Sequence, residues 1–254
     1  MKKIVGIVMS FIFIFSFGNV SFANSLSELD SKVLYNAQEI TDIDLLYERA
    51  KHGISDVVSK NPDQNIAFVR DAPINGTIKE YTTTQKLLAV EKNGVLEESF
   101  KTVSFLVYTE EKSTDEEKPG LIQPRGSKEE EDWDSSKGVR AYSTVKYTRS
   151  TNNNLYTYKL DSVSGGWNSY DHGTLIIERK VKYGITGNAQ GSGIAVSKSS
   201  GDLYPNQNTF DYTAPSSWPA LESNVVMGVN TYITLKRQSG TYEWTLHLQN
   251  NLTN

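Results

Sequence analysis

The residues best suited to acid–base chemistry are Asp171 and His172, which close the stretch SVSGGWNSYDHG at residues 162–173. A neutral histidine can act as a general base, and a carboxylate can orient it if a serine or a water also approaches. The pair is therefore a weak candidate for the centre of an extracellular hydrolase. A polar turn between strands explains the same residues, because Gly, Asn and Asp favour turns.

Other catalytic and metal signatures are absent from the sequence. The chain has only three histidines and no cysteine, and it contains no HExxH, GxSxG or P-loop motif. His52 lies four residues after Glu48 and four before Asp56, but ion pairing on a solvated helix face accounts for this spacing. We therefore predict no metal site and no cofactor, and we favour a non-enzymatic protein.

Calcium is a separate question. The stretch DWDSSKG begins like a calcium loop, yet Lys137 stands where the sharp turn requires glycine, so an EF-hand is excluded. Asn206, Asn208 and Asp211 could supply oxygen ligands, but their spacing matches no known calcium loop. Calcium binding by these loops stays open.

Aromatic side chains gather in the second half of the chain. Ten of the 14 tyrosines and three of the four tryptophans lie after residue 138. Exposed rings of this kind can stack on sugars or anchor a protein partner. The alternative is that they build a β core. The candidate ligand-binding residues are Trp167, Tyr170, Tyr204 and Trp218, and Tyr142 is a further candidate for an exposed ring.

The amino terminus has the pattern of a secretory signal peptide. Lys2 and Lys3 precede an apolar run at residues 4–17, and Ser21 and Ala23 bracket a cleavage site after Ala23. We predict that residues 1–23 are removed and that the protein is secreted to the extracellular space. No later run is long and apolar enough for a membrane helix, so no stable membrane insertion is expected. The absence of cysteine suits an exported protein of a Gram-positive bacterium.

Charge divides the mature chain into two parts. Residues 24–137 carry 14 basic and 23 acidic side chains, whereas residues 138–254 carry 10 and 7. The basic residues form no cluster interleaved with aromatics, so no nucleic-acid partner is expected. The acidic stretch at residues 110–137 is rich in Glu and poor in apolar residues, which is typical of an exposed linker.

Residues 24–109 have the pattern of a helical segment followed by a β-hairpin. Ser25 and Glu28 fit a capping box, which predicts a first helix, and a stripe starting after Thr41 predicts a second. The pair Asn93 and Gly94 predicts a two-residue hairpin turn. Counting outward from this turn sets Lys86 opposite Lys101, so we expect a bulge in the pairing.

Residues 138–254 alternate apolar and polar positions in about seven short stretches, which predicts an antiparallel β-sandwich. A turn at Ser239 and Gly240 gives the clearest register, because it sets Leu235 opposite Trp244 on an apolar face and Lys236 opposite Glu243 on a polar one. A further strand should start just after Gly173, which makes SGGWNSYDHG a connection between strands.

Several segments of this half resemble a group of uncharacterised exported proteins of Bacillus and related Firmicutes. They are YSTVKYT, YKLDSVSGGW, KVKYGITG, FDYTAPSSW and TLKRQSGTYEWTLHLQNN. The resemblance implies export and a β-rich carboxy-terminal domain, and it implies no activity or ligand. Taken together, the sequence predicts a secreted, soluble, non-enzymatic module that binds cell-wall glycan, another extracellular polymer or a protein partner. The alternatives are the hydrolase centred on Asp171 and His172 and a membrane-active β toxin.

Overall fold

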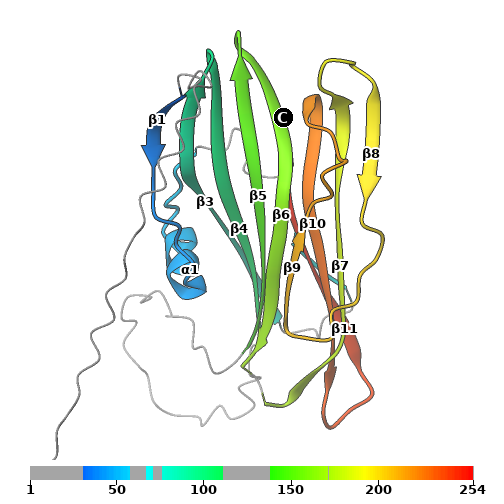
Figure 1. Cartoon of the computed structure of the whole chain (residues 1–254). Coiled ribbons are helices and arrows are strands. Elements are labelled where there is room, and N and C mark those ends of the chain that lie inside the picture. Colours follow the sequence, from blue (N-terminus) through cyan, green and yellow to red (C-terminus); the bar gives the residue numbers. More distant parts are fainter. Residues whose placement is uncertain (1–30, 58–66, 71–75, 111–137, 171, 254) are drawn as a thin grey trace, which may run out of the picture.

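The computed structural model describes residues 31–57, 67–70, 76–110, 138–170 and 172–253 (Figure 1). The predicted signal peptide, at residues 1–23, lies outside the described residues, as does the predicted linker apart from Glu110. The described part is mostly β, with one short helix, α1 (Ile43–Lys51). No helix in this part is both long and apolar enough to cross a membrane.

Long strands dominate the structure, and every pairing between described strands is antiparallel. The strands are β1 (Ser31–Asn36), β2 (Ala67–Arg70), β3 (Gly76–Lys92), β4 (Val95–Glu110), β5 (Gly138–Asn152), β6 (Leu155–Ser169), β7 (Thr174–Ala189), β8 (Ala195–Ser199), β9 (Thr209–Thr213), β10 (Leu221–Arg237) and β11 (Glu243–Thr253).

The eleven strands form one hydrogen-bonded network made of two sets (Figure 1). The first set runs β1-β3-β4-β5-β6 with β9 on the free side of β6, and the second runs β8-β7-β10-β11-β2. Among the described residues the sets are joined by a single pair, Leu221 with Tyr158. Residues 138–254 do contain seven strands, but they are not a separate seven-strand sandwich. Strand β4 pairs with β5 from Leu96↔Thr151 to Thr109↔Gly138, so the sheet continues across the predicted linker.

One buried apolar cluster contains residues from both sets of strands. Leu106, Val145 and Leu160 come from the first set, and Ile233 and Leu246 come from the second, all at most 3 % exposed. Because side chains alternate between the two faces of a strand, each long strand contributes every second residue to this core.

The helix α1 covers the opposite face of the first set. Its buried residues Leu46, Tyr47 and Ala50 pack on Val103 and Phe105 of β4. Asp42 caps the helix by accepting hydrogen bonds from the backbone N–H groups of residues 44 and 45. The helix begins close to the predicted Thr41 and ends at Lys51.

Two hairpins confirm the sequence prediction. Leu235 pairs with Trp244 and Lys236 with Glu243, so the register of the last hairpin is as predicted. Strands β3 and β4 are joined through Asn93 and Gly94, and both residues have positive φ, as a type I′ turn requires. The expected bulge is present: the register shifts between Lys86 and Leu88, which moves Lys86 opposite Phe100 instead of Lys101.

Two other predictions were wrong. Residues 31–36 form strand β1 rather than part of a helix, because this segment pairs with the far end of β3. The stretch SGGWNSYDHG is not wholly a connection, since β6 continues through Ser169 and only residues 170–173 lie between β6 and β7. The start of β7 at Thr174, just after Gly173, agrees with the prediction.

Candidate functional site

Trp167 lies in the core rather than at the surface. Its side chain is completely buried in β6, and its ring lies 5.5 Å from that of Phe210 of β9. Gly165, two residues before Trp167, lies under the same phenylalanine, because a Cβ there would come within 2.7 Å of the Phe210 ring. The indole therefore packs the join between β6 and β9, and its predicted exposure was wrong.

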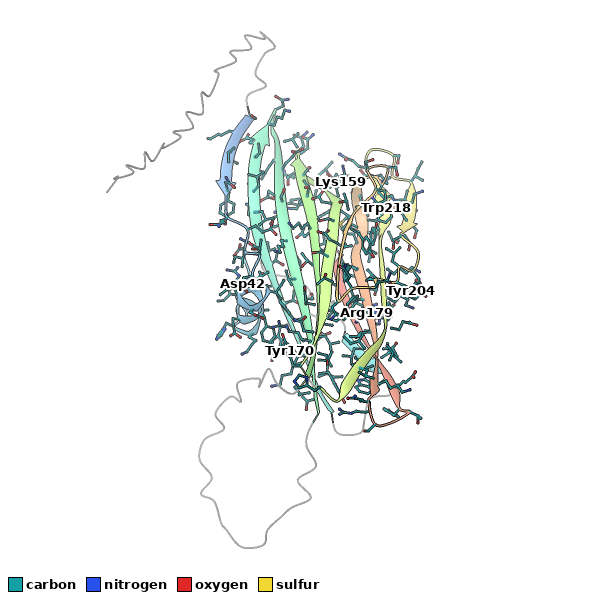
Figure 2. The ribbon with its side chains drawn as sticks, turned by 60° about the horizontal axis from the view of Figure 1, so that its bottom comes forward. Asp42, Lys159, Tyr170, Arg179, Tyr204 and Trp218 are labelled. Carbon is teal, nitrogen blue, oxygen red and sulfur yellow. The ribbon has the colours of Figure 1, made fainter. Side chains whose placement is uncertain are left out.

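The other three candidate aromatics do not converge on one site (Figure 2). Tyr170 is half-buried, and its hydroxyl accepts a hydrogen bond from Arg140 at 3.0 Å. Trp218 packs against the core, 5.5 Å from the ring of Tyr183. Tyr204 is 60 % exposed in the loop between β8 and β9, so it alone has the predicted open position.

The structure describes only one residue of the candidate acid–base pair Asp171 and His172. His172 is exposed in the turn between β6 and β7, while Asp171 lies outside the described residues. Within the part of the chain that the structure describes, no cluster of three or more His, Asp or Glu side chains is arranged to hold a metal ion. Of the three residues considered for calcium, Asn208 already accepts hydrogen bonds from the guanidinium of Arg179 through its side-chain oxygen.

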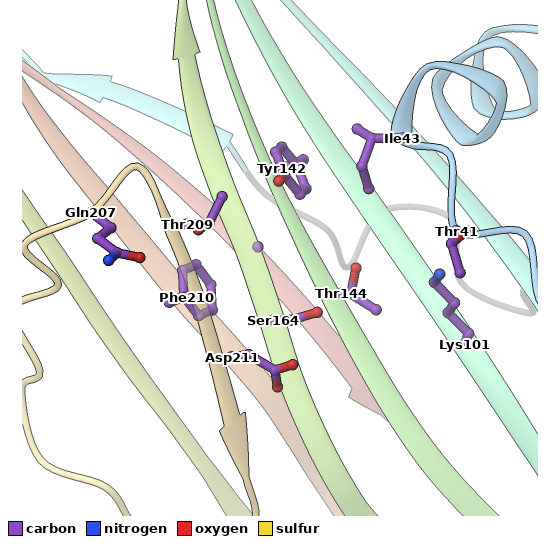
Figure 3. A pocket seen from close by; sticks show the side chains of 11 residues that line it. Thr41, Ile43, Lys101, Tyr142, Thr144, Ser164, Gln207, Thr209, Phe210 and Asp211 are labelled. Atoms are coloured by element: carbon purple, nitrogen blue, oxygen red, sulfur yellow. The ribbon is translucent and has the colours of Figure 1, made fainter. Parts of the chain in front are cut away.

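A pocket of about 420 Å³ lies on the α1-covered side of the first set of strands (Figure 3). Five parts of the chain supply its walls: the start of α1 with Thr41 just before it, β4, β5, β6, and β9 with the loop that leads into it. The lining residues are Thr41, Ile43, Lys101, Tyr142, Thr144, Ser164, Gly165, Gln207, Thr209, Phe210 and Asp211.

The pairing of β5 with β6 and of β6 with β9 brings the sheet residues of this pocket together. Thr144 of β5 pairs with Ser164 of β6, and Ser164 pairs with Asp211 of β9, so three polar residues lie side by side across three strands. Thr209 at the start of β9 and Gln207 in the loop before it extend this polar row, and both are exposed. The arrangement offers hydroxyl, amide and carboxylate groups to one ligand.

Two aromatic rings complete the walls. Tyr142 is half-buried, and burial raises the pKa of its phenol, so the hydroxyl stays protonated at neutral pH. The ring of Phe210 lies over Gly165, whose missing side chain makes room for it. The Phe210 ring is only 6 % exposed and packs on Trp167 and Tyr212, so Tyr142 is the half-exposed ring beside the polar row. A pocket with polar groups beside an aromatic ring suits a ligand with alternating hydroxyl and C–H surfaces.

Lys101 lines the pocket, but its charge is already engaged in an ion pair with Glu39. Its ammonium, on a side chain 6 % exposed, donates to Glu39 Oε1 at 2.8 Å and to the carbonyl oxygen of Ile40 at 2.7 Å. Lys146 donates to the other oxygen of Glu39 at 2.8 Å. Burial raises the pKa of the Glu39 carboxyl, but the hydrogen bonds from both lysines outweigh it and hold that pKa below its ordinary value. These contacts fix the segment before α1 as a pocket wall.

No protein-family model matches this chain, and comparison with the curated proteins and with the solved structures finds no match. The pocket therefore rests on its own geometry. Sequence reasoning identified Tyr142 and Asp211 as residues of interest, but for different reasons and not as neighbours. It missed Thr144, Ser164 and Gln207, because no spacing along the chain connects residues that only strand pairing brings together.

Proposed function

We propose that this protein is a secreted, non-enzymatic binding module, and that its pocket holds a sugar-sized segment of a cell-wall or other extracellular polysaccharide. The observation that carries the proposal is the row of Thr144, Ser164 and Asp211 facing one pocket beside the ring of Tyr142. The predicted signal peptide and the resemblance to exported Bacillus proteins support an extracellular role.

The size and chemistry of the pocket favour a saccharide over other small ligands. Its volume of about 420 Å³ lies near the lower end of the range for small-molecule sites, about 300–1,000 Å³. Its cation, Lys101, is engaged by Glu39, while Asp211 is exposed and adds negative charge. An anionic ligand would meet this carboxylate, whereas the hydroxyls of a neutral sugar can donate to it.

The proposal is tested by retention of the mature chain, residues 24–254, on insoluble peptidoglycan and a panel of insoluble polysaccharides. The test variant is Gln207→Ala with Asp211→Ala, which removes two exposed pocket groups. We expect the unaltered chain to be retained on one class of polymer and the variant to bind it about tenfold more weakly, the loss expected for one to two hydrogen bonds.

The matched control is Glu97→Ala with Gln238→Ala, which removes one carboxylate and one amide from exposed positions outside the pocket. It should bind like the unaltered chain. Equal weakening of both variants, or no retention on any polymer, would refute the pocket as a glycan site. The same supernatants are assayed for released sugars and peptides, and product release abolished by His172→Ala would instead establish a hydrolase.

A further inference from the structure

The two most exposed large aliphatic side chains in the described part of the molecule stand at hairpin tips. Leu155, which begins β6, is 72 % exposed, and Ile194, in the turn between β7 and β8, is 65 % exposed. Single exposed apolar residues are common on protein surfaces, so exposure alone does not indicate a binding surface. The shared position of these two residues at hairpin tips is the feature that suggests one.

Both tips lie at the same end of the molecule. Leu221 at the start of β10 pairs with Tyr158, three residues after Leu155, and also with Ala189, the last residue of β7. The end of β7 is thereby aligned with the start of β6. The turn at Asn93 and Gly94 is at this end too, because Leu96 pairs with Thr151. Figure 1 shows these hairpin tips together at the top of the view.

Each tip has a fixed backbone that directs its aliphatic residue outward. Asn153 and Asn154 both have positive φ, so β5 and β6 are joined by a tight two-residue turn before Leu155. At the other tip, the N–H of Ala189 donates to the carbonyl oxygen of Ile194 at 2.8 Å. The apolar side chains are therefore presented by ordered turns and need little further ordering to bind.

The turn residues themselves carry no charge, and the exposed side chains just before the first turn, Glu91 and Lys92, have opposite charges. The turns consist of Asn93–Gly94, Asn153–Asn154 and Gly191–Ser192–Gly193. The nearby carboxylate of Glu222 accepts a hydrogen bond from the N–H of Gly191 at 3.0 Å. Behind Leu155, Tyr156 is 46 % exposed and lies 5.3 Å from the guanidinium of Arg149. Tyrosine and arginine behind an apolar tip are the residue types favoured at the boundary between lipid and water.

We propose that this end of the molecule docks on the surface of a lipid bilayer, with Leu155 and Ile194 entering the interfacial region and the strands remaining outside. A stable protein interface needs about 800 Å² on each partner in one complementary patch. Two narrow tips on different strand sets supply separate points of insertion instead, and a fluid surface can accept each independently. The neutral turns fit a zwitterionic bilayer rather than an anionic one.

The first experiment measures co-sedimentation of the mature chain with phosphatidylcholine vesicles. The test variant is Leu155→Ser with Ile194→Ser, which should keep the melting temperature because both side chains are exposed. The control is Leu175→Ser with Ile177→Ser, a pair 45 % and 44 % exposed near the other end of β7. We expect the tip variant to partition at least about tenfold less than the unaltered chain, and the control to partition like it.

A second measurement reports which end meets the lipid. The chain contains no cysteine, so Leu155→Cys and Leu175→Cys each give one site for a polarity-sensitive fluorophore. Vesicles should shift the emission of the label at residue 155 to the blue and leave the label at residue 175 unchanged.

Four outcomes would overturn the proposal. They are no partition by the unaltered chain, equal losses in both double variants, binding only to anionic vesicles at low salt, and self-association in solution that the tip variant abolishes. The last would assign the tips to a second copy of the chain. The pocket variant Gln207→Ala with Asp211→Ala should leave vesicle binding unchanged, so the two proposals fail or succeed separately.

Discussion

The side-chain amide of Asn250 in β11 donates to the carbonyl oxygen of Ser143 in β5 at 2.8 Å, joining the two sets of strands through the core. The same nitrogen lies 3.2 Å from the carbonyl oxygen of Thr102 in β4. Asn250 is 1 % exposed, so water cannot replace it. One buried amide therefore ties β11 of the second set to both β4 and β5 of the first.

Asn250→Ala should lower the free energy of unfolding by about 2–3 kcal/mol, because two buried carbonyl groups lose their side-chain donor. Urea unfolding followed by tryptophan fluorescence measures the change. Asn206→Ala, an exposed loop position, is the control and should change stability by less than about 0.5 kcal/mol. A loss at position 250 as small as that of the control would mean that the amide bonds do not hold the layers together.

Gly165→Ala should destabilise the protein by about 1–3 kcal/mol through overpacking. Its new Cβ would lie 2.4 Å from the carbonyl oxygen of Tyr142 and 2.7 Å from the Phe210 ring, so β9 must move. Thermal unfolding measures the effect. The control is Gly240→Ala, where the nearest atom would be 3.7 Å away. An unchanged melting temperature for the variant at position 165 would contradict the close packing of β9 on β6.

Lowering the pH should decrease the free energy of unfolding through protonation of Glu98. Its carboxylate accepts hydrogen bonds from Lys86 at 2.7 Å and from Arg149 at 3.0 Å. Burial raises the pKa of Glu98, but these hydrogen bonds outweigh it and hold the folded-state pKa below the ordinary 4.5. A lowered folded-state pKa means that the stabilisation is complete above pH 4.5 and is lost as the pH falls through the folded-state pKa.

The corresponding measurement is the melting temperature of Glu98→Gln between pH 7 and pH 3. The variant should melt below the unaltered chain at pH 7, and the difference should shrink as the pH falls below 4.5. Glu97→Gln changes the neighbouring exposed carboxyl and should behave like the unaltered chain at every pH. A constant difference between the Glu98→Gln and unaltered chains across this range would show that the ion pairs do not carry the effect.

Asn154→Gly should raise the free energy of unfolding by about 0.5 kcal/mol, because glycine at the second turn position adopts positive φ without steric cost. Asn154 has φ +64° in this turn. Chemical denaturation measures the gain. The same change at Asn206, where the structure records no positive φ, should give no gain. Destabilisation at position 154 would mean that the asparagine side chain contributes more than the turn conformation.

Sequence reasoning succeeded where the decisive contacts are local. The hairpin around Ser239 and Gly240 joins adjacent strands, so alternation alone selected the register that pairs Leu235 with Trp244. The clash of Lys86 with Lys101 likewise indicated the bulge in β3. In both cases a short loop fixes which residues face each other, and the pattern of apolar side chains settles the remaining choice.

Prediction from the sequence failed where a segment distant in the chain determines the local structure. Residues 31–36 have an acceptable helical pattern, but their pairing with β3 makes them a strand. Gly165 and Gly166 read as turn residues, yet they lie inside β6, where the approach of β9 excludes side chains. The pocket could not be predicted for the same reason, since Thr144, Ser164 and Asp211 become neighbours only through the register of three strands.

The pairing of β11 with β2 limits how early the second set of strands can fold. Leu248 pairs with Ala67, so a strand close to the end of the chain completes a sheet with one close to its beginning. Loops between such distant partners are slow to close, and folding rates fall as contacts become less local. The second set of strands therefore cannot be completed before β11 has been synthesised. The hairpin of β3 and β4, whose partners are adjacent in the chain, needs no such distant contact and can form first.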